Sequence, residues 1–456
     1  MRARIISGGA LLWMALVWCA TLQAQQSPGA PGQYSGPNIL SRWSRQAGAG
    51  QPAANRLSAY LHASGAYLGG LTGPVSLEDS RGSSSGDNSF TTLFGGGLNL
   101  THTGKRNLIT LNYLGNYSRS YSVSNGYNGV NQNVNLNFEH QLSRRWGFYT
   151  GHTAGTQSNI LAVSRGFTQS NLFDQTYSAA VEALDARLKF FNSGAGFYFQ
   201  KSSRIAMSFD GGVFSVSRNA VALASSRGER AQGEFSYRLD RRQSIGSYYS
   251  YSHFYYPRGF GESFVHSVML SYTRRLNRSW NLQASGGPYI AQSERTQQIA
   301  VDPYIASLTG QTTTLTAFRG TSRGVGVNAS LNGLFRRQSV FTSYRRAIDP
   351  GNGITLTSLS DFVNFHYSYQ TTRNFSTGVG VYYTQLTPVL EGAERSSQFR
   401  SQGGSLNMSY RLHSMVYLTG NVGAQNVKYG GLGFSRLRKV AVIGLAFSPG
   451  DLPLFR

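Results

Sequence analysis

The sequence predicts an all-β fold: a transmembrane up-and-down antiparallel β-barrel of about 18 strands, with a range of about 16 to 20. Short basic turns recur along the chain, and the segments between them alternate polar and apolar residues. The turns lie at 103–106, 143–145, 201–204, 240–242, 277–279, 336–338, 372–374 and 412–414. Longer connections rich in Gly, Ser and Asn follow every second segment. This order of strand, long loop, strand and short turn is typical of such barrels.

The N-terminus predicts a signal peptide over residues 1–24. Arg2 and Arg4 precede an apolar stretch of about 14 residues, and Leu22-Gln23-Ala24 is a plausible cleavage site. The stretch is short for a membrane anchor helix, which needs about 20 residues. Trp18 precedes Cys19 where lipid-attachment sites carry a small residue, so lipidation is disfavoured. Cys19 is the only cysteine, and the mature chain would therefore contain no disulfide.

Three further regions follow. Residues 25–56, rich in Pro, Gly, Gln and Ser, predict a flexible periplasmic segment, with a plug as an alternative role. Residues 57–448 carry the alternating segments and predict the barrel. Residues 449–456 predict a short C-terminal tail. We find no pattern that indicates a separate soluble domain.

Composition limits the other fold classes. The chain has 456 residues and is 40% hydrophobic. No segment after the signal approaches 18 consecutive apolar residues, which excludes helical membrane spans there. Only 13% of residues are charged, against about 25% in soluble domains. An array of soluble β-sandwiches would need more ionic surface than this chain supplies.

The alternation is clearest at 130–142, and it predicts a water-filled interior, because strand side chains point to opposite faces with period two. One face carries Val130, Val134, Leu136, Phe138 and Leu142. The other face, predicted to line the lumen, carries Asn131, Asn133, Asn135, Asn137 and Glu139. The same parity predicts further lumen-lining residues: Asp210, Arg230, Glu234, Arg238, Arg275, Arg345 and Arg411. A sealed core would bury these polar groups at a cost.

Two segments alternate less cleanly. The parity of 188–199 changes around 192–194, which predicts a β-bulge. Segment 245–256 is aromatic on both faces, and its orientation stays open.

The connections predict the orientation. Short turns are expected on the periplasmic side and long loops outside. The longest loops are expected at 69–89, 157–184 and 292–321. Trp146 and Trp280 each follow a basic turn directly, where an interface girdle would place them.

The formal net charge of +23 restricts the partners. The basic residues are spread singly over turns and strands and form no dense patch, so the sequence predicts no nucleic-acid partner. Cations in the periplasmic turns could meet phosphates of the inner leaflet. The predicted lumen arginines outnumber the predicted lumen acids, which favours anionic solutes.

The sequence lacks the motifs of common catalytic and metal sites. It contains no H-E-x-x-H pair, no G-x-S-x-G elbow and no phosphate-binding G-x-x-x-x-G-K-[ST] loop. We therefore predict no enzyme, no catalytic residues, no metal site and no cofactor. A barrel hydrolase could still assemble Ser, His and Asp from different strands.

Read in this way, residues 57–448 resemble bacterial outer-membrane β-barrel proteins of the porin-like kind. The resemblance is architectural and rests on no family motif. It implies a cell outer-membrane location, and as partners outer-membrane lipid, lipopolysaccharide and the barrel assembly machinery. Many such proteins end on an aromatic residue, whereas here Phe455 is penultimate and follows a last strand that ends near Phe447.

The leading functional hypothesis is passive or weakly selective passage of small, preferentially anionic solutes. The first alternative is export of an acidic exopolysaccharide, a polymeric anionic solute. The second is a barrel enzyme or surface adhesin that uses the long loops. The sequence leaves open the solute, the oligomeric state and whether a loop folds into the lumen.

Overall fold

A computed structural model describes residues 56–71, 87–121, 128–158, 187–219, 223–258, 260–300, 313–389, 398–430, 434–449 and 451–453. The predicted signal peptide and nearly all of the predicted periplasmic segment lie outside these residues. Among the residues that the structure describes, no helix is long and apolar enough to cross a membrane.

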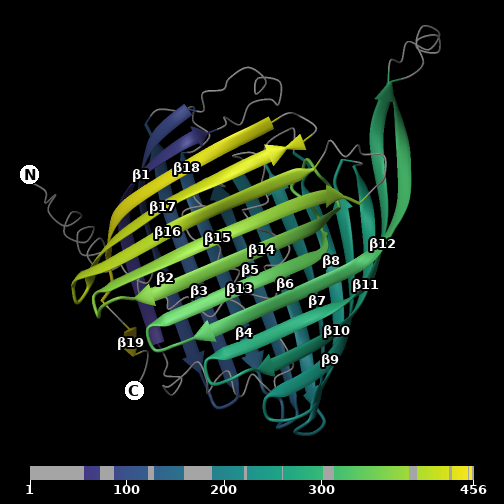
Figure 1. Cartoon of the computed structure of the whole chain (residues 1–456), viewed down its shortest axis with the longest axis horizontal. Helices are drawn as coiled ribbons and strands as arrows, with labels where there is room; N and C mark the ends of the chain where they lie inside the picture. The colour runs from purple at the N-terminus through teal and green to yellow at the C-terminus, as the bar shows by residue number, and fades with distance from the viewer. Residues whose placement is uncertain are drawn as a thin grey trace, which may run out of the picture.

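Eighteen long strands and one short strand make up the described chain (Figure 1). The first nine are β1 (Arg56–Leu71), β2 (Asp87–Thr103), β3 (Asn107–Ser120), β4 (Gly129–His140), β5 (Trp146–Ser158), β6 (Arg187–Gln200), β7 (Ile205–Arg218), β8 (Ser226–Arg238) and β9 (Gln243–Tyr256). The others are β10 (Gly261–Arg275), β11 (Trp280–Ala300), β12 (Thr313–Leu334), β13 (Gln338–Asp349), β14 (Ser358–Gln370), β15 (Phe375–Pro388), β16 (Phe399–His413), β17 (Val416–Tyr429), β18 (Phe434–Phe447) and β19 (Asp451–Pro453).

The long strands form one closed antiparallel sheet. Each pairs with the next along the chain, and β18 pairs with β1, from Leu61 opposite Phe447 to Gly69 opposite Lys439. The predicted up-and-down barrel of about 18 strands is confirmed. Closure leaves no free edge along the body of the sheet, because each long strand is hydrogen-bonded to a neighbour on both sides.

The region predicted as a C-terminal tail contributes to the sheet. Strand β19 pairs antiparallel with the first residues of β1, with Arg56 opposite Pro453 and Ser58 opposite Asp451. The pairing that closes the barrel at β1 is thereby extended at the short-turn end, beyond the last residue of β18.

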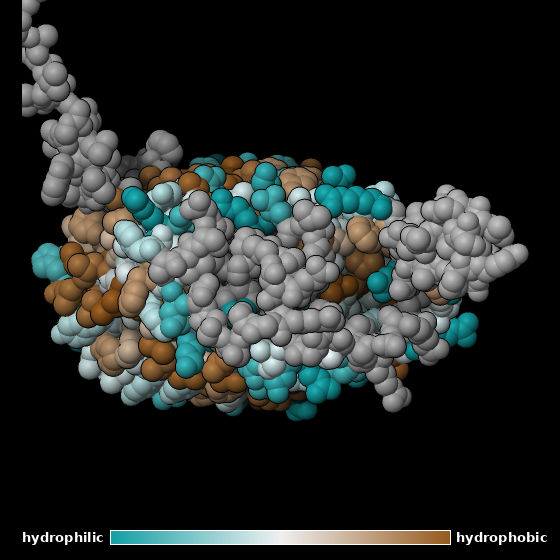
Figure 2. Space-filling model, turned by 90° about the horizontal axis from the view of Figure 1, so that it is seen from above, coloured by the Kyte–Doolittle hydropathy of each residue, from teal (hydrophilic) through white to brown (hydrophobic). Residues whose placement is uncertain are grey.

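Exposed apolar side chains define the outer face. Leu136, Phe191, Leu270, Val422 and Ile443 are among many large hydrophobic residues that are more than a third exposed. They alternate along their strands with buried or polar residues, and hydrophobic side chains recur around the outer wall (Figure 2). Lipid is the environment that such a belt fits, and a closed barrel with this belt is an outer-membrane architecture.

Two expectations about the strands are wrong. No bulge occurs at 192–194, because β6 pairs with β5 and β7 in continuous register. Residues 292–321 are mostly not a loop: β11 and β12 continue their pairing from Gln292 opposite Thr321 to Ala300 opposite Thr313. This hairpin extends past the ends of the neighbouring strands (Figure 1).

Side chains of the short turns explain why the chain reverses there. Asp240 Oδ1 accepts the backbone N–H groups of Arg242 (2.5 Å) and Gln243 (2.8 Å). Asn277 Oδ1 accepts those of Ser279 (2.8 Å) and Trp280 (2.9 Å). Ser143, Ser202 and Thr372 do the same with their hydroxyls. These local bonds favour tight turns without tertiary help.

Candidate functional site

The connection between β13 and β14, residues 350–357, folds into the barrel. We call it the inward loop. Asn352, Thr355 and Thr357 are at most 7% exposed, whereas residues in the short turns are exposed. Its polar and apolar partners lie on inner faces of distant strands, so the loop occupies the lumen.

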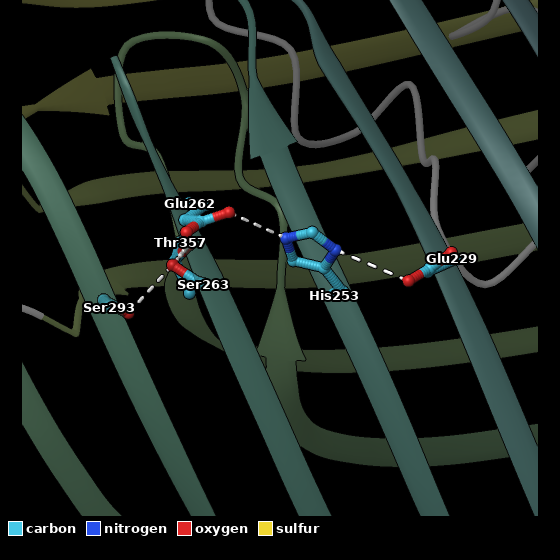
Figure 3. A network of polar contacts seen from close by, with 6 residues as sticks. All are labelled: Glu229, His253, Glu262, Ser263, Ser293 and Thr357. Atoms are coloured by element: carbon cyan, nitrogen blue, oxygen red, sulfur yellow. Dashed lines mark hydrogen bonds and ion pairs between the residues drawn. The ribbon is translucent and has the colours of Figure 1, made fainter. Parts of the chain in front are cut away.

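One side of the inward loop is fixed to β9 and β10. The Tyr256 hydroxyl donates to the Pro350 carbonyl at 3.1 Å and lies 2.8 Å from the Thr357 hydroxyl. Thr357 also contacts Ser263, whose hydroxyl donates to Ser293 on β11 at 2.9 Å (Figure 3). These contacts join the loop to three strands that precede it in the sheet.

An apolar cluster strengthens this attachment. Leu356 of the loop packs against inner-facing residues of β6, β7 and β9 to β11. The buried members are Leu188, Phe214, Val216, Phe254, Tyr256, Val265, Tyr289, Ala291 and Ile348. Leu356 is partly buried in this cluster, so it contributes less than the roughly 1.5–3 kcal/mol of a fully buried side chain.

The other side of the loop is fixed to β15, β16 and β17. The Thr355 hydroxyl lies 2.9 Å from the Tyr429 hydroxyl. Ile354 packs against a second buried cluster, Leu386, Phe399, Val427 and Tyr429. The loop therefore crosses part of the lumen and connects two groups of strands that are not neighbours.

Glycines and one asparagine set the shape of the loop. Gly351 and Gly353 have φ values of +71° and +89°, a region that side chains rarely adopt. A Cβ at Gly351 would lie 1.9 Å from the Thr355 carbonyl oxygen. Asn352 Oδ1 accepts the N–H groups of Ile354 (3.2 Å) and Thr355 (2.9 Å). The conformation is thus specified within the loop as well as by its docking.

A buried cation lies beside the loop. Arg218, at the end of β7, is 7% exposed and donates to the Ala224 carbonyl at 2.8 Å. The Ala224 N–H in turn donates to the Gly353 carbonyl at 2.9 Å. The residues just before β8 are therefore part of the same inward structure.

The amide residues predicted for the lumen form a hydrogen-bonded wall on β3 to β5. Asn131 donates to Asn116 at 3.0 Å, and Asn135 donates to Thr153 at 3.2 Å. Asn137 donates to Asn135 at 2.6 Å. Asn133 and Glu139 share their strand parity, and Glu139 accepts a bond from Tyr198 at 3.4 Å.

Carboxylates reduce the charge of the arginines predicted for the lumen. Asp210 on β7, and Arg230 and Glu234 on β8, share one face of the sheet, where Asp210 interacts favourably with Arg230 and unfavourably with Glu234. Arg345 forms an ion pair with Asp349, in which the two side chains are 21% and 18% exposed. Asp349 had not been predicted as part of the site.

The remaining predicted arginines lie at the short-turn end. Arg275 donates to the carbonyls of Asn277 (3.2 Å) and Arg278 (3.3 Å). Arg411 donates to those of His413 (3.4 Å) and Ser414 (3.2 Å). Arg238 is the last residue of β8, next to the turn. These three are distant along the strands from the inward loop.

The two predicted girdle tryptophans begin strands at the same end. Trp146 is 43% exposed, and its ring centroid lies 4.4 Å from that of Phe199. Trp280 packs edge-on against Phe335 with ring centroids 5.5 Å apart. Amphipathic rings beside the turns suit a membrane–water interface.

Sequence reasoning missed the inward loop, although one signal pointed to it. Leu188, Phe214, Phe254 and Tyr256 place apolar side chains on inner faces that are otherwise polar, near the long-loop ends of their strands. The same broken alternation underlies the expected bulge at 192–194 and the open orientation of 245–256. An apolar inner face requires something apolar to cover it.

Figure 3 also shows a polar group on the outer face. His253 Nε2 lies 3.1 Å from Glu262, and its Nδ1 lies 3.6 Å from Glu229. Within the described part of the chain, no group of three or more His, Cys, Asp or Glu residues could hold a metal ion.

Comparisons with known proteins return structural similarity alone. No protein-family model and no curated protein matches the sequence. OccK2 (OpdF) of Pseudomonas aeruginosa is 13% identical with a TM-score of 0.42, over 86% of this chain and 98% of that one. OpdK of the same organism is 12% identical with a TM-score of 0.42, over 86% and 99%. A BenF-like porin from Pseudomonas fluorescens is 11% identical with a TM-score of 0.41, over 86% and 98%. Such values transfer no solute and no residue role to this chain.

Proposed function

We infer that the protein is an outer-membrane channel through which small, preferentially anionic solutes diffuse, and that the inward loop sets its size limit. The observation that carries this proposal is the loop itself, which is fixed at both sides inside the barrel. Export of an acidic polymer and an enzymatic role remain alternatives with no specific support.

The number of strands supports conduction. Barrels of 16 to 18 strands enclose more space than their own side chains fill. The inner faces near the short turns carry Ser, Asn and Gly, for example Ser285, Asn328 and Ser409. Such groups favour water over packed side chains, so this half suits an aqueous vestibule.

The inward loop supports a limit on solute size. Its contacts to Tyr256 and Tyr429 lie on separate strand groups, so it cannot swing aside without losing contacts on one side. A polymer chain would require a wider opening than a small solute does.

Cations on inner strand faces support an anion preference. Arg218 lies beside the loop, and Arg438 of β18 is 3% exposed and donates to Gln425 at 3.3 Å. Arg345 is offset by Asp349, so the preference rests on the other lumen cations. In a narrow aqueous path their field attracts anions.

Planar-bilayer recording tests the proposal. The wild-type protein should conduct, and in a salt gradient its reversal potential should indicate anion preference. Replacement of residues 351–356 by a Gly-Ser linker of equal length should raise conductance and admit larger solutes in a liposome-swelling assay. A folded protein that never conducts, with or without the linker, would refute the channel.

A further inference from the structure

We propose that a row of uncharged polar side chains on the lumen wall binds polyhydroxylated solutes, namely small sugars, and guides them along the channel. The row has one inner-face residue on each of five neighbouring strands: Asn99, Asn112, Asn135, Thr153 and Asn192. We call it the amide row. The inference rests on the proposed channel and names a class of solute for it, and it does not depend on the anion preference.

The members of the amide row are direct cross-strand partners. Asn99 on β2 lies opposite Asn112 on β3, which in turn lies opposite Asn135 on β4. Asn135 lies opposite Thr153 on β5, and Thr153 lies opposite Asn192 on β6. Directly opposed residues share one face of a sheet, with Cβ atoms about 4.5–5.5 Å apart. The five side chains therefore form an unbroken line across the wall.

The amide row borders the lumen. Val134 and Leu136, which flank Asn135 on β4, are exposed on the apolar outer face, so Asn135 and its partners in the row point into the barrel. Asn135 is only partly buried there, as are Asn99 and Asn112. A solute in the lumen therefore meets these three amides.

The amide row rises from the short-turn end toward the inward loop. Asn99 lies four residues from Thr103, the last residue of β2, whereas Asn192 lies eight residues from Gln200, the last residue of β6. Barrel strands are tilted by about 35–45°, so a line across them also advances along the barrel axis. Phe190, on the same face of β6 as Asn192, packs against the apolar cluster that holds the inward loop. A solute that follows the row thus passes between the vestibule and the inward loop.

The amide row offers both donors and acceptors. Each asparagine carries a carbonyl oxygen and an NH2 group. Asn135 donates to Thr153 at 3.2 Å and accepts from Asn137 at 2.6 Å, so these side chains also hold one another in place. Asn192 is 6% exposed, and its Nδ2 has no hydrogen-bond partner in the part of the chain that the structure describes. A buried donor of this kind is costly unless an oxygen reaches it.

Sugars match this mixture of donors and acceptors. A sugar hydroxyl both donates and accepts, so neighbouring hydroxyls can exchange their water partners for the N–H and C=O groups of successive amides. A carboxylate only accepts and an ammonium group only donates, so either ion leaves half of each amide to water. Because the members are evenly spaced, a sugar can bind the next amide before it has left the previous one.

Block of the ion current by uncharged solutes tests the amide row in planar bilayers. D-Glucose has hydroxyls around its ring, whereas triethylene glycol, a neutral solute of similar size, presents mainly ether oxygens that accept but do not donate. D-Glucose should block the wild-type channel saturably, and triethylene glycol should not. In Asn112→Leu with Asn135→Leu, which nearly conserves side-chain size, the half-blocking glucose concentration should rise at least about tenfold, or about 1.4 kcal/mol of binding.

The matched control removes two inner-face asparagines from another wall. Asn364→Leu with Asn407→Leu alters β14 and β16 and should leave the half-blocking glucose concentration unchanged. Heat-modifiable electrophoretic mobility establishes that each variant is folded. If N112L/N135L does not assemble, Asn112→Ser with Asn135→Ser keeps the wall polar, removes both amides and should weaken the block in the same direction.

The amide row and the channel fail in different ways. A conducting wild-type protein that glucose and triethylene glycol affect equally would overturn the amide row and leave the channel intact. An unchanged half-blocking concentration in the folded amide variant, or an equal rise in the control variant, would also overturn it. A folded wild-type protein that never conducts would refute the channel and, with it, the guidance of sugars.

Discussion

Tyr256 and Thr357 lie 101 residues apart in the sequence, and their hydroxyls are 2.8 Å apart inside the barrel. The Tyr256 hydroxyl also donates to the Pro350 carbonyl. One side chain of β9 thus holds both ends of the inward loop, and through it the β13–β14 connection becomes part of the lumen.

Tyr256→Phe should loosen the inward loop while keeping the packing of the ring. Loss of the hydroxyl leaves Thr357 and the Pro350 carbonyl without this partner, at a cost of about 1–3 kcal/mol. We expect more frequent current fluctuations and a higher mean conductance in planar bilayers. Tyr255→Phe, on the outer face, is the matched control and should behave as wild type. Identical recordings from both variants would show that this contact does not hold the loop.

Gly351→Ala should displace the loop more strongly. The positive φ and the 1.9 Å approach of a Cβ to the Thr355 carbonyl both oppose a side chain here. Conductance and the size limit in liposome swelling should rise, with barrel assembly retained. Gly380→Ala, where the nearest atom lies at 3.5 Å, is the control. Wild-type conductance in Gly351→Ala would show that the shape of the inward loop does not set the size limit.

Leu136→Arg and Asn135→Arg should differ, because neighbouring residues face opposite sides of the sheet. Leu136 is 37% exposed on the apolar outer face, where a mid-membrane arginine costs about 2–4 kcal/mol. We expect impaired assembly of Leu136→Arg, measured by heat-modifiable mobility, and assembly of Asn135→Arg. Equal tolerance of the two variants would contradict the assignment of inner and outer faces on this strand.

Cysteine labelling should report the orientation, since Cys19 is the only natural cysteine and lies in the predicted signal peptide. A cysteine at Asn219, at the long-loop end of β7, should react with a membrane-impermeant maleimide on intact cells. Cysteines at Ser143 and Ser279, in short turns, should react only after the outer membrane is opened. The reverse pattern would place the short turns outside.

Replacement of lumen arginines should weaken anion selectivity. Arg230→Ser with Arg238→Ser removes two cations from the inner face. The reversal potential in a salt gradient should shift toward cation preference. Fixed charges are screened over about 10 Å at 0.1 M salt, so the shift should shrink as salt rises. Arg241→Ser with Arg242→Ser, in an exposed turn, is the control, and an equal shift there would remove the basis for lumen selectivity.

Local patterns in the sequence determined the barrel. The alternation at 130–142, the capped turns at Asp240 and Asn277, and the apolar residues around Leu136 each act within one or two strands. Period-two side-chain direction and turn chemistry depend on neighbouring residues alone. Fold class, strand number and the two faces of β4 were therefore predictable.

Only the tertiary structure decided what lies inside. Ile354 and Leu356 belong to a short Gly- and Thr-containing connection, and nothing local distinguishes it from an exposed loop. Its partners, Tyr256 and Tyr429, lie on strands that are far from it in the sequence, and closure of the barrel brings them together. Contacts of this kind follow from the closed shape of the sheet, which no local pattern encodes.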